Sequence, residues 1–80
     1  MNQLNLRIEL ADGTVLDVQS SAGDIVKWEA YFNLGIDKLE KFTHLLYLAW
    51  LGVTRLKKTA EDFDSWIELV GKVEVADPKG

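Results

Sequence analysis

The run LLYLAWLGV, at residues 45–53, constrains the fold more than any other feature, because eight of its nine residues are apolar and the ninth is a glycine. The chain has only 80 residues, which predicts a single domain (1–80) with a small core. A helix in such a domain usually buries one face and leaves the other in water. The run therefore holds more apolar side chains than one buried stripe needs, and something must cover the surplus.

A helix is predicted over residues 37–58, with Asp37 as its N-cap. On a wheel of about 100° per residue, one face is apolar and wide enough to be the core stripe. This face carries Leu39, Phe42, Leu46, Ala49, Val53 and Leu56, with Leu45 and Trp50 at its edges. The opposite face carries Glu40, His44, Tyr47, Leu48, Leu51 and Arg55.

Two interpretations of that opposite face are open. In the first, this helix is the central element, with the hairpin on one side and the other helices on the other. In the second, all six residues bind a partner: Tyr47, Leu48 and Leu51 form an apolar patch, and the three polar residues rim it. Burial of Leu48 and Leu51 within one chain would rule the patch out at this site.

Residues 1–19 alternate between apolar and polar around an Asp-Gly pair, which predicts a β-hairpin. The loop is predicted to hold three residues, Ala11–Gly13, with Gly13 in a left-handed bulge. That register sets Arg7 opposite Asp17 and gathers the apolar side chains on one face. A two-residue loop would mix apolar and charged side chains on both faces.

Two more helices are predicted, over residues 21–34 and 59–71, and an extended tail follows over residues 72–80. Ser21 and Asp24 can form a capping box, and Gly35 suits the left-handed position after the first helix. Thr59 is the expected cap of the last helix. The tail has brief alternation that allows a short edge strand. The predicted fold class is therefore α+β, mostly α: an N-terminal β-hairpin, three helices and a possible short C-terminal edge strand.

Several conspicuous side chains have plain structural interpretations. Trp28, Trp50 and Trp66 fall on or beside apolar stripes, so core packing is expected, with each indole N–H near a partner at the rim. His44 is expected to be a polar surface residue, and as a lone imidazole it is a poor ligand or catalyst. Arg55 is expected to pair with a surface acid if it does not rim a patch, a contact that contributes little.

Composition argues against several classes of function. The net charge of −4 disfavours nucleic-acid binding, which needs a basic surface. Without cysteine, thiolate metal sites and disulfides are excluded. No Gly-rich phosphate loop or metal-ligand spacing occurs, so we expect no catalytic, cofactor or metal site and no small-molecule substrate. The apolar run is too short to span a bilayer and no signal peptide is present, which predicts a soluble intracellular protein.

Three short motifs stand in order along residues 22–75. They are Trp28-Glu29 with Phe32, the Leu-Ala-Trp-Leu segment 48–51 with Arg55, and Phe63-x-x-Trp66 followed by Val73-Glu74. With these motifs the chain resembles the small tail assembly chaperones of long-tailed bacteriophages. The motifs are apolar packing patterns rather than catalytic signatures, and the N-terminal hairpin lies outside them.

The resemblance implies a function in the host bacterial cytoplasm. Chaperones of this family bind the long, apolar, helical tape measure protein, keep it soluble during tail assembly and help bring tail tube subunits to it. They need no cofactor, they are not secreted, and they are expected to be absent from the mature virion. The resemblance further implies a longer form made by programmed ribosomal slippage, for which Asp77-Pro78-Lys79 could be encoded by a slippery sequence.

Two alternatives stay open beside the chaperone. One is another small phage structural adaptor, such as a head–tail connector or tail completion component. The other is a self-associating domain, in which the second apolar face of the long helix is a homo-oligomer interface. An enzyme is disfavoured because the sequence offers no convergent polar groups.

Overall fold

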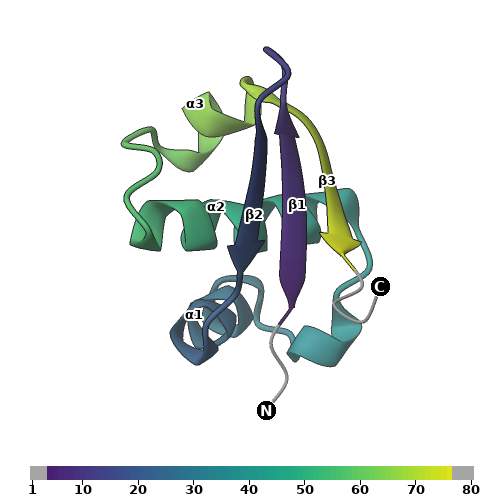
Figure 1. The fold of residues 1–80 in the computed structure, drawn as a ribbon. Coiled ribbons are helices and arrows are strands. Elements are labelled where there is room, and N and C mark those ends of the chain that lie inside the picture. Colours follow the sequence, from purple (N-terminus) through teal and green to yellow (C-terminus); the bar gives the residue numbers. More distant parts are fainter. Residues whose placement is uncertain (1–3, 77–80) are drawn as a thin grey trace.

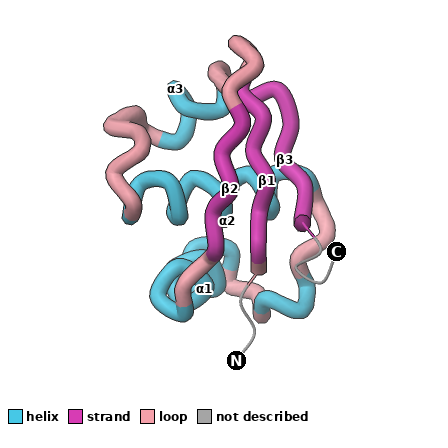
Figure 2. The backbone as a smooth tube through the Cα atoms, viewed as in Figure 1, coloured by secondary structure: helices cyan, strands magenta, loops and turns pink. Residues whose placement is uncertain are grey.

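The computed structural model of the chain describes residues 4–76 as one sheet with helices on one of its faces (Figure 1). Three strands make the sheet: β1 (Asn5–Leu10), β2 (Val15–Gln19) and β3 (Val70–Ala76). The helices are α1 (Ala22–Phe32), α2 (Phe42–Arg55) and α3 (Phe63–Ile67), with a short 3-10 helix, η1 (Ile36–Lys38), before α2. Figure 2 shows α2 crossing behind the strands.

The sheet corrects the predicted fold class. It is antiparallel with the order β2-β1-β3, and β3, with 7 residues, pairs with β1 from Asn5↔Ala76 to Leu10↔Val70. The C-terminal segment is thus an integral strand of the sheet, and the expectation of an extended tail or a short edge strand is wrong. The described chain is also not mostly α, since 45% of residues 4–76 are helical and 25% are in strands.

The third strand has a physical reason, because the backbone N–H and C=O groups of β1 need hydrogen-bond partners on both edges. A two-stranded hairpin is marginal in water and leaves one edge of β1 without partners, and β3 supplies those hydrogen bonds. The end of the predicted tail, residues 77–80, lies outside the described residues, as does the site of the implied slippage.

The predicted hairpin register is confirmed. Arg7 pairs with Asp17 across β1 and β2, and their side chains form an ion pair with 3.1 Å between Nε and Oδ1. Gly13 has a φ of 95°, the left-handed conformation that the three-residue loop requires. The Asp12 carboxylate accepts a hydrogen bond from the Thr14 N–H at 2.9 Å, which holds the pKa of Asp12 below its usual range.

The core lies between the sheet and the helices. Its buried apolar residues come from all three strands and all three α-helices: Leu6, Ile8, Val18, Trp28, Leu48, Ala49, Leu51, Val53, Trp66 and Val73. The opposite face of the sheet carries mainly polar residues, and Arg7 on the central strand has Asp17 on one side and Glu74 on the other. The sheet therefore buries one face only, as antiparallel sheets commonly do.

Local capping signals locate the start of α1 but not its end. The Ser21 hydroxyl accepts a hydrogen bond from the Asp24 N–H, and the Asp24 carboxylate accepts one from the Ser21 N–H, both at 3.1 Å, so the predicted capping box is confirmed. The left-handed residue after the helix is Asn33, with a φ of 57°, rather than Gly35. Asparagine tolerates this conformation better than most residues.

Both later helices are shorter than predicted. Asp37 lies in η1 and does not cap α2, which begins only at Phe42. Thr59 does not cap α3 either, because its hydroxyl accepts from the Glu61 N–H in the preceding loop. The cap of α3 is Asp62, whose carboxylate accepts from the Ser65 N–H at 2.8 Å.

The predicted core face of α2 is partly wrong. Ala49 and Val53 are buried as predicted, but Phe42 is 55% exposed. The side that contacts the sheet includes Gly52, where an added Cβ would lie only 2.6 Å from Val18 Cγ1. With this side of the helix against the sheet, Leu48 and Leu51, which were expected on the free face, are buried in the core.

Candidate protein-interaction surface

The structure places the predicted apolar patch largely inside the molecule. Leu48 is fully buried and Leu51 is 9% exposed, and both belong to the core that the sheet and helices share. The patch hypothesis therefore fails at these two residues, and the interpretation of α2 as the central element holds. Tyr47 is the one apolar member of the six that retains partial exposure.

His44 is a structural residue rather than the rim of a patch. It is buried, and its Nδ1 accepts hydrogen bonds from the backbone N–H groups of Glu40, at 3.2 Å, and Lys41, at 3.3 Å. Its carbonyl oxygen accepts the Trp28 indole N–H at 2.9 Å. His44 thereby satisfies donors at the start of α2, where no aspartate or serine is available to do so. Of the predicted rim, Glu40 is exposed.

Arg55 also serves the fold. Its Nε donates to Asp24 Oδ2 at 3.0 Å, and a terminal guanidinium nitrogen donates to the carbonyl of Gln19 at 2.8 Å. The Asp24 side chain is only 4% exposed, so this is not the surface contact that the sequence suggested. Arg55 joins the end of α2 to the start of α1 and the end of β2.

A different apolar surface remains at the helices, and we call it the aromatic strip: Tyr31, Tyr47, Trp50 and Phe63. The rings of Tyr31 and Tyr47 are stacked, with centroids 4.1 Å apart and planes 11° apart. Tyr47 also contacts Trp50 at 5.5 Å and Phe63 at 5.1 Å, and Trp50 contacts Phe63 at 5.8 Å. Tyr31 is 60% exposed and the other three are partly exposed. The strip thus runs from α1 across α2 to α3.

An inner layer of rings holds the strip in place. Phe32 packs edge-on against Tyr47, at 5.5 Å, and against His44, at 4.7 Å, and it also contacts the buried Trp28 at 5.0 Å. The pKa of the Tyr47 phenol is raised above its usual value of 10.0, mainly by burial and secondly by the neighbouring Tyr31. Rings fixed in this way lose little conformational entropy when a partner covers them.

Hydrogen bonding fixes one more member of the strip. The Trp50 indole N–H donates to the carbonyl of Glu61 at 3.0 Å, which ties the loop before α3 to α2. Trp28 and Trp66 are buried as predicted, whereas Trp50 is only partly buried. Its ring is therefore at the margin of the core, with its polar atom satisfied inside the chain.

Sequence reasoning missed the strip because its members come from three separate helices. One local signal was present: Tyr47 and Trp50 are three residues apart and therefore share a helix face. Nothing local relates either of them to Tyr31 or Phe63, whose positions depend on how α1 and α3 pack.

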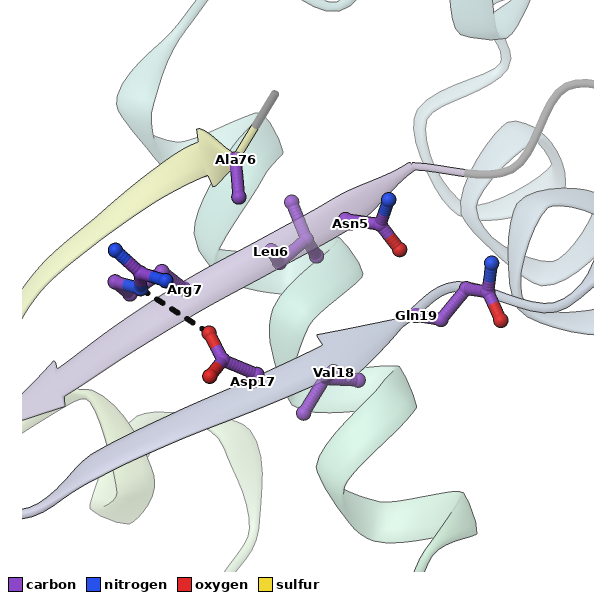
Figure 3. Close-up of a pocket in the computed structure, with 7 residues that line it drawn as sticks. All are labelled: Asn5, Leu6, Arg7, Asp17, Val18, Gln19 and Ala76. Atoms are coloured by element: carbon purple, nitrogen blue, oxygen red, sulfur yellow. Dashed lines mark hydrogen bonds and ion pairs between the residues drawn. The ribbon is translucent and has the colours of Figure 1, made fainter. Parts of the chain in front are cut away.

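The sheet carries another candidate site, a hollow of about 330 Å³ (Figure 3). It is lined by Asn5, Leu6, Arg7, Asp17, Val18, Gln19 and Ala76. Its two charged residues, Arg7 and Asp17, neutralise each other across the strands. With no net charge and little apolar depth, the hollow is a weaker candidate than the strip.

Metal chemistry and membrane spanning were tested on the described part of the chain. Within residues 4–76, no group of histidine and carboxylate side chains is placed to hold a metal ion. None of the helices described there combines the length and the apolarity that crossing a bilayer requires.

Comparison with known proteins adds no relative. No protein-family model, curated protein or solved structure matches this chain.

Proposed function

We propose that this chain is a bacteriophage tail assembly chaperone, which binds helical segments of the tape measure protein and keeps them soluble in the host cytoplasm. The proposal takes the family from the motifs along residues 22–75 and the binding surface from the structure. It makes the chain a binding protein rather than an enzyme, with the tail tube protein as a possible second partner.

The aromatic strip is the observation that carries the proposal. Tyrosine and tryptophan are the residues most often responsible for binding energy at protein interfaces, because they offer a large apolar area with few rotatable bonds. The strip holds both types on packed helices, and the Trp50 indole N–H already has its partner within the chain. An amphipathic helix laid across it would bury its apolar face against rings that are already in position.

The acidic character of the chain suits the same task. An apolar helix in complex with a protein of net charge −4 gains a charged surface that opposes aggregation. No covalent step, metal or nucleotide is needed for this activity, since binding alone shields the apolar face of the client.

Co-expression tests the proposal. The client is the tape measure protein of a long-tailed bacteriophage, and the measurement is its soluble fraction with and without this chain. We expect the wild type to keep the client soluble and Tyr31→Asp to lose most of that effect. Tyr31 is chosen because it is 60% exposed, so a carboxylate there should not unfold the domain.

Val26 supplies a matched control. It lies on the same helix and is 64% exposed, and its position five residues before Tyr31 puts it on a different side of α1, so Val26→Asp should retain full activity. A Tyr31→Asp variant as active as the wild type would show that the strip is not the binding surface. A wild-type chain that leaves the client insoluble would contradict the chaperone function itself.

A further inference from the structure

We propose that the helix bound by the aromatic strip has a cationic edge, and that its lysine or arginine side chains lie over Glu61, Asp62 and Asp64 at the α3 end. This inference rests on the proposed function, because it specifies the chemistry of the segment that the strip receives. It follows from where three exposed carboxylates lie relative to the rings of the strip.

The first step is the position of the carboxylates. Asp62 and Asp64 flank Phe63, a member of the strip, and the backbone of Glu61 is held against Trp50 by the indole hydrogen bond of 3.0 Å. All three acids are exposed. The three acids therefore border Phe63 and the loop that Trp50 holds, at the α3 end of the strip, and we call them the acidic margin.

The second step is that no lysine or arginine in the described residues forms an ion pair with these carboxylates. The ion pairs found within residues 4–76 join Arg7 to Asp17 and Arg55 to Asp24, and neither involves the acidic margin. The hydrogen bond from the Ser65 N–H lowers the pKa of Asp62 and so favours its ionised form. The nearest lysines in sequence, Lys57 and Lys58, follow the end of α2, where cations offset the negative pole of the helix dipole.

The third step is the opposite end of the strip. Lys27 precedes Tyr31 by one helical turn on α1 and is exposed, so it lies on the same side of the helix as that ring. A cation on the bound helix is therefore favoured near α3 and disfavoured near α1. The charge gradient along the strip gives the bound helix a preferred direction.

The rings reinforce the preference for cations. The faces of tryptophan and tyrosine attract a lysine or arginine head group within about 6 Å. Trp50 and Tyr47 are both partly exposed, and both contact Phe63, which Asp62 and Asp64 flank. A basic side chain arriving there meets a negative ring face and a carboxylate together. Neutral or acidic side chains gain neither contact.

The test uses two synthetic amphipathic helices with the same apolar face. One carries lysine along the edge of that face and the other carries glutamate, and binding is followed by tryptophan fluorescence, to which the partly exposed Trp50 is the responsive reporter. We expect the lysine peptide to bind roughly tenfold more tightly, as a few exposed ion pairs would give. The difference should shrink as salt screens the charges.

Charge variants locate the effect. Glu61→Gln, Asp62→Asn and Asp64→Asn together remove the acidic margin, and this triple variant should lose the preference for lysine. The change Asp62→Asn keeps a side-chain oxygen that can cap α3, so the helix should still form. The matched control is Glu9→Gln, Asp17→Asn and Glu74→Gln, which removes the same charge from the open face of the sheet and should keep the preference.

Each other outcome has a distinct meaning. Equal binding of both peptides by the wild type, or equal loss in the two triple variants, would overturn the cationic edge and leave strip binding intact. If neither peptide binds, the result would count against the strip and the proposed function. A concentration-dependent dimer that Tyr31→Asp abolishes would show that a second copy of the chain covers the strip, and would overturn the inference.

Discussion

Arg55 Nε lies 3.0 Å from Asp24 Oδ2, a contact that joins the last turn of α2 to the first turn of α1. The same carboxylate oxygen also accepts from the Ser21 N–H, so one buried group closes a capping box and an interhelical ion pair. The guanidinium adds a bond to the carbonyl of Gln19 and so reaches β2. Three elements that meet at this corner of the fold therefore depend on one arginine.

We expect Arg55→Met to lower the free energy of unfolding by about 1–3 kcal/mol, because the Asp24 carboxylate would stay buried without its cation. Urea unfolding measures the change. Lys27→Met is the control: this exposed lysine has no ion pair among those found in residues 4–76, so it should change stability by less than about 0.5 kcal/mol. Wild-type stability in Arg55→Met would mean that the pair contributes nothing.

Gly52→Ala should destabilise the domain by about 1–3 kcal/mol. The added Cβ would come within 2.6 Å of Val18 Cγ1, and a β-branched side chain in a packed core has little room to move. The better helix propensity of alanine offsets part of this loss. Thermal unfolding of Gly52→Ala, Val18→Ala and the double variant measures it, and the double variant should lose less than the two single changes combined.

Gly23 offers the matched glycine for that experiment. It also lies in a helix, but an added Cβ there would meet only the Ser21 hydroxyl at 3.7 Å, an ordinary contact. Gly23→Ala should therefore leave stability unchanged or raise it slightly. Equal effects at the two glycines would show that α2 does not approach β2 as closely as described.

Lys57→Gly should stabilise the domain by about 1 kcal/mol. Lys57 has a φ of 59°, and its N–H and that of Lys58 bond to the carbonyls of Thr54 and Val53, which is the Schellman arrangement at the end of a helix. A non-glycine residue in this conformation costs about 1–2 kcal/mol, which exceeds the extra entropy that glycine loses on folding. Lys58→Gly, which relieves no such strain, should not stabilise; urea midpoints compare the two.

The titration of Tyr47 tests how firmly the strip is packed. Burial first, and Tyr31 second, raise the pKa of Tyr47 above 10.0, so the folded chain holds this proton more tightly than the unfolded chain. The resulting stability is complete below about pH 10 and is lost as the pH rises through the folded pKa. In Tyr31→Phe, where Tyr47 is the only tyrosine, phenolate absorbance should rise at a higher pH in buffer than in urea. Equal midpoints would mean that the ring is solvated.

Features that depend on neighbouring residues were predictable from the sequence. The two-residue alternation and the Asp12-Gly13 pair fix the hairpin, and Arg7 opposite Asp17 follows from keeping one face apolar. The capping box of Ser21 and Asp24 needs only four consecutive residues. Each of these is a local choice among a few conformations, so the pattern is sufficient.

The orientation of α2 was not predictable in this way. A helical wheel takes polar residues as markers of solvent, and both His44 and Arg55 are polar residues whose hydrogen bonds are made inside the chain. Their partners are backbone groups and a carboxylate on other elements. Only the small Gly52 marked the side that approaches the sheet, and a glycine alone does not say what it approaches.

The third strand and the aromatic strip could not be predicted from the sequence for a similar reason, because each depends on contacts between distant segments. Pairing of Val73 with Ile8 requires the second edge of β1, at the other end of the sequence. Contact of Tyr31 with Tyr47 requires the packing of α1 on α2. Neither relationship has a sequence period or a short motif, because each arises when distant segments are brought together.

Asn5 and Ala76 lie opposite each other on β1 and β3, although nearly all of the described chain separates them. A short linker joining these positions would turn the most distant pairing of the sheet into a hairpin, and new ends after Lys58 would leave every strand and helix whole. Because closing long loops slows folding, such a circular permutant should reach its native state faster than the natural order of the same elements. In the natural order, the central strand β1 is synthesised before both of its neighbours, and one of its edges stays unpaired until β3 has been made.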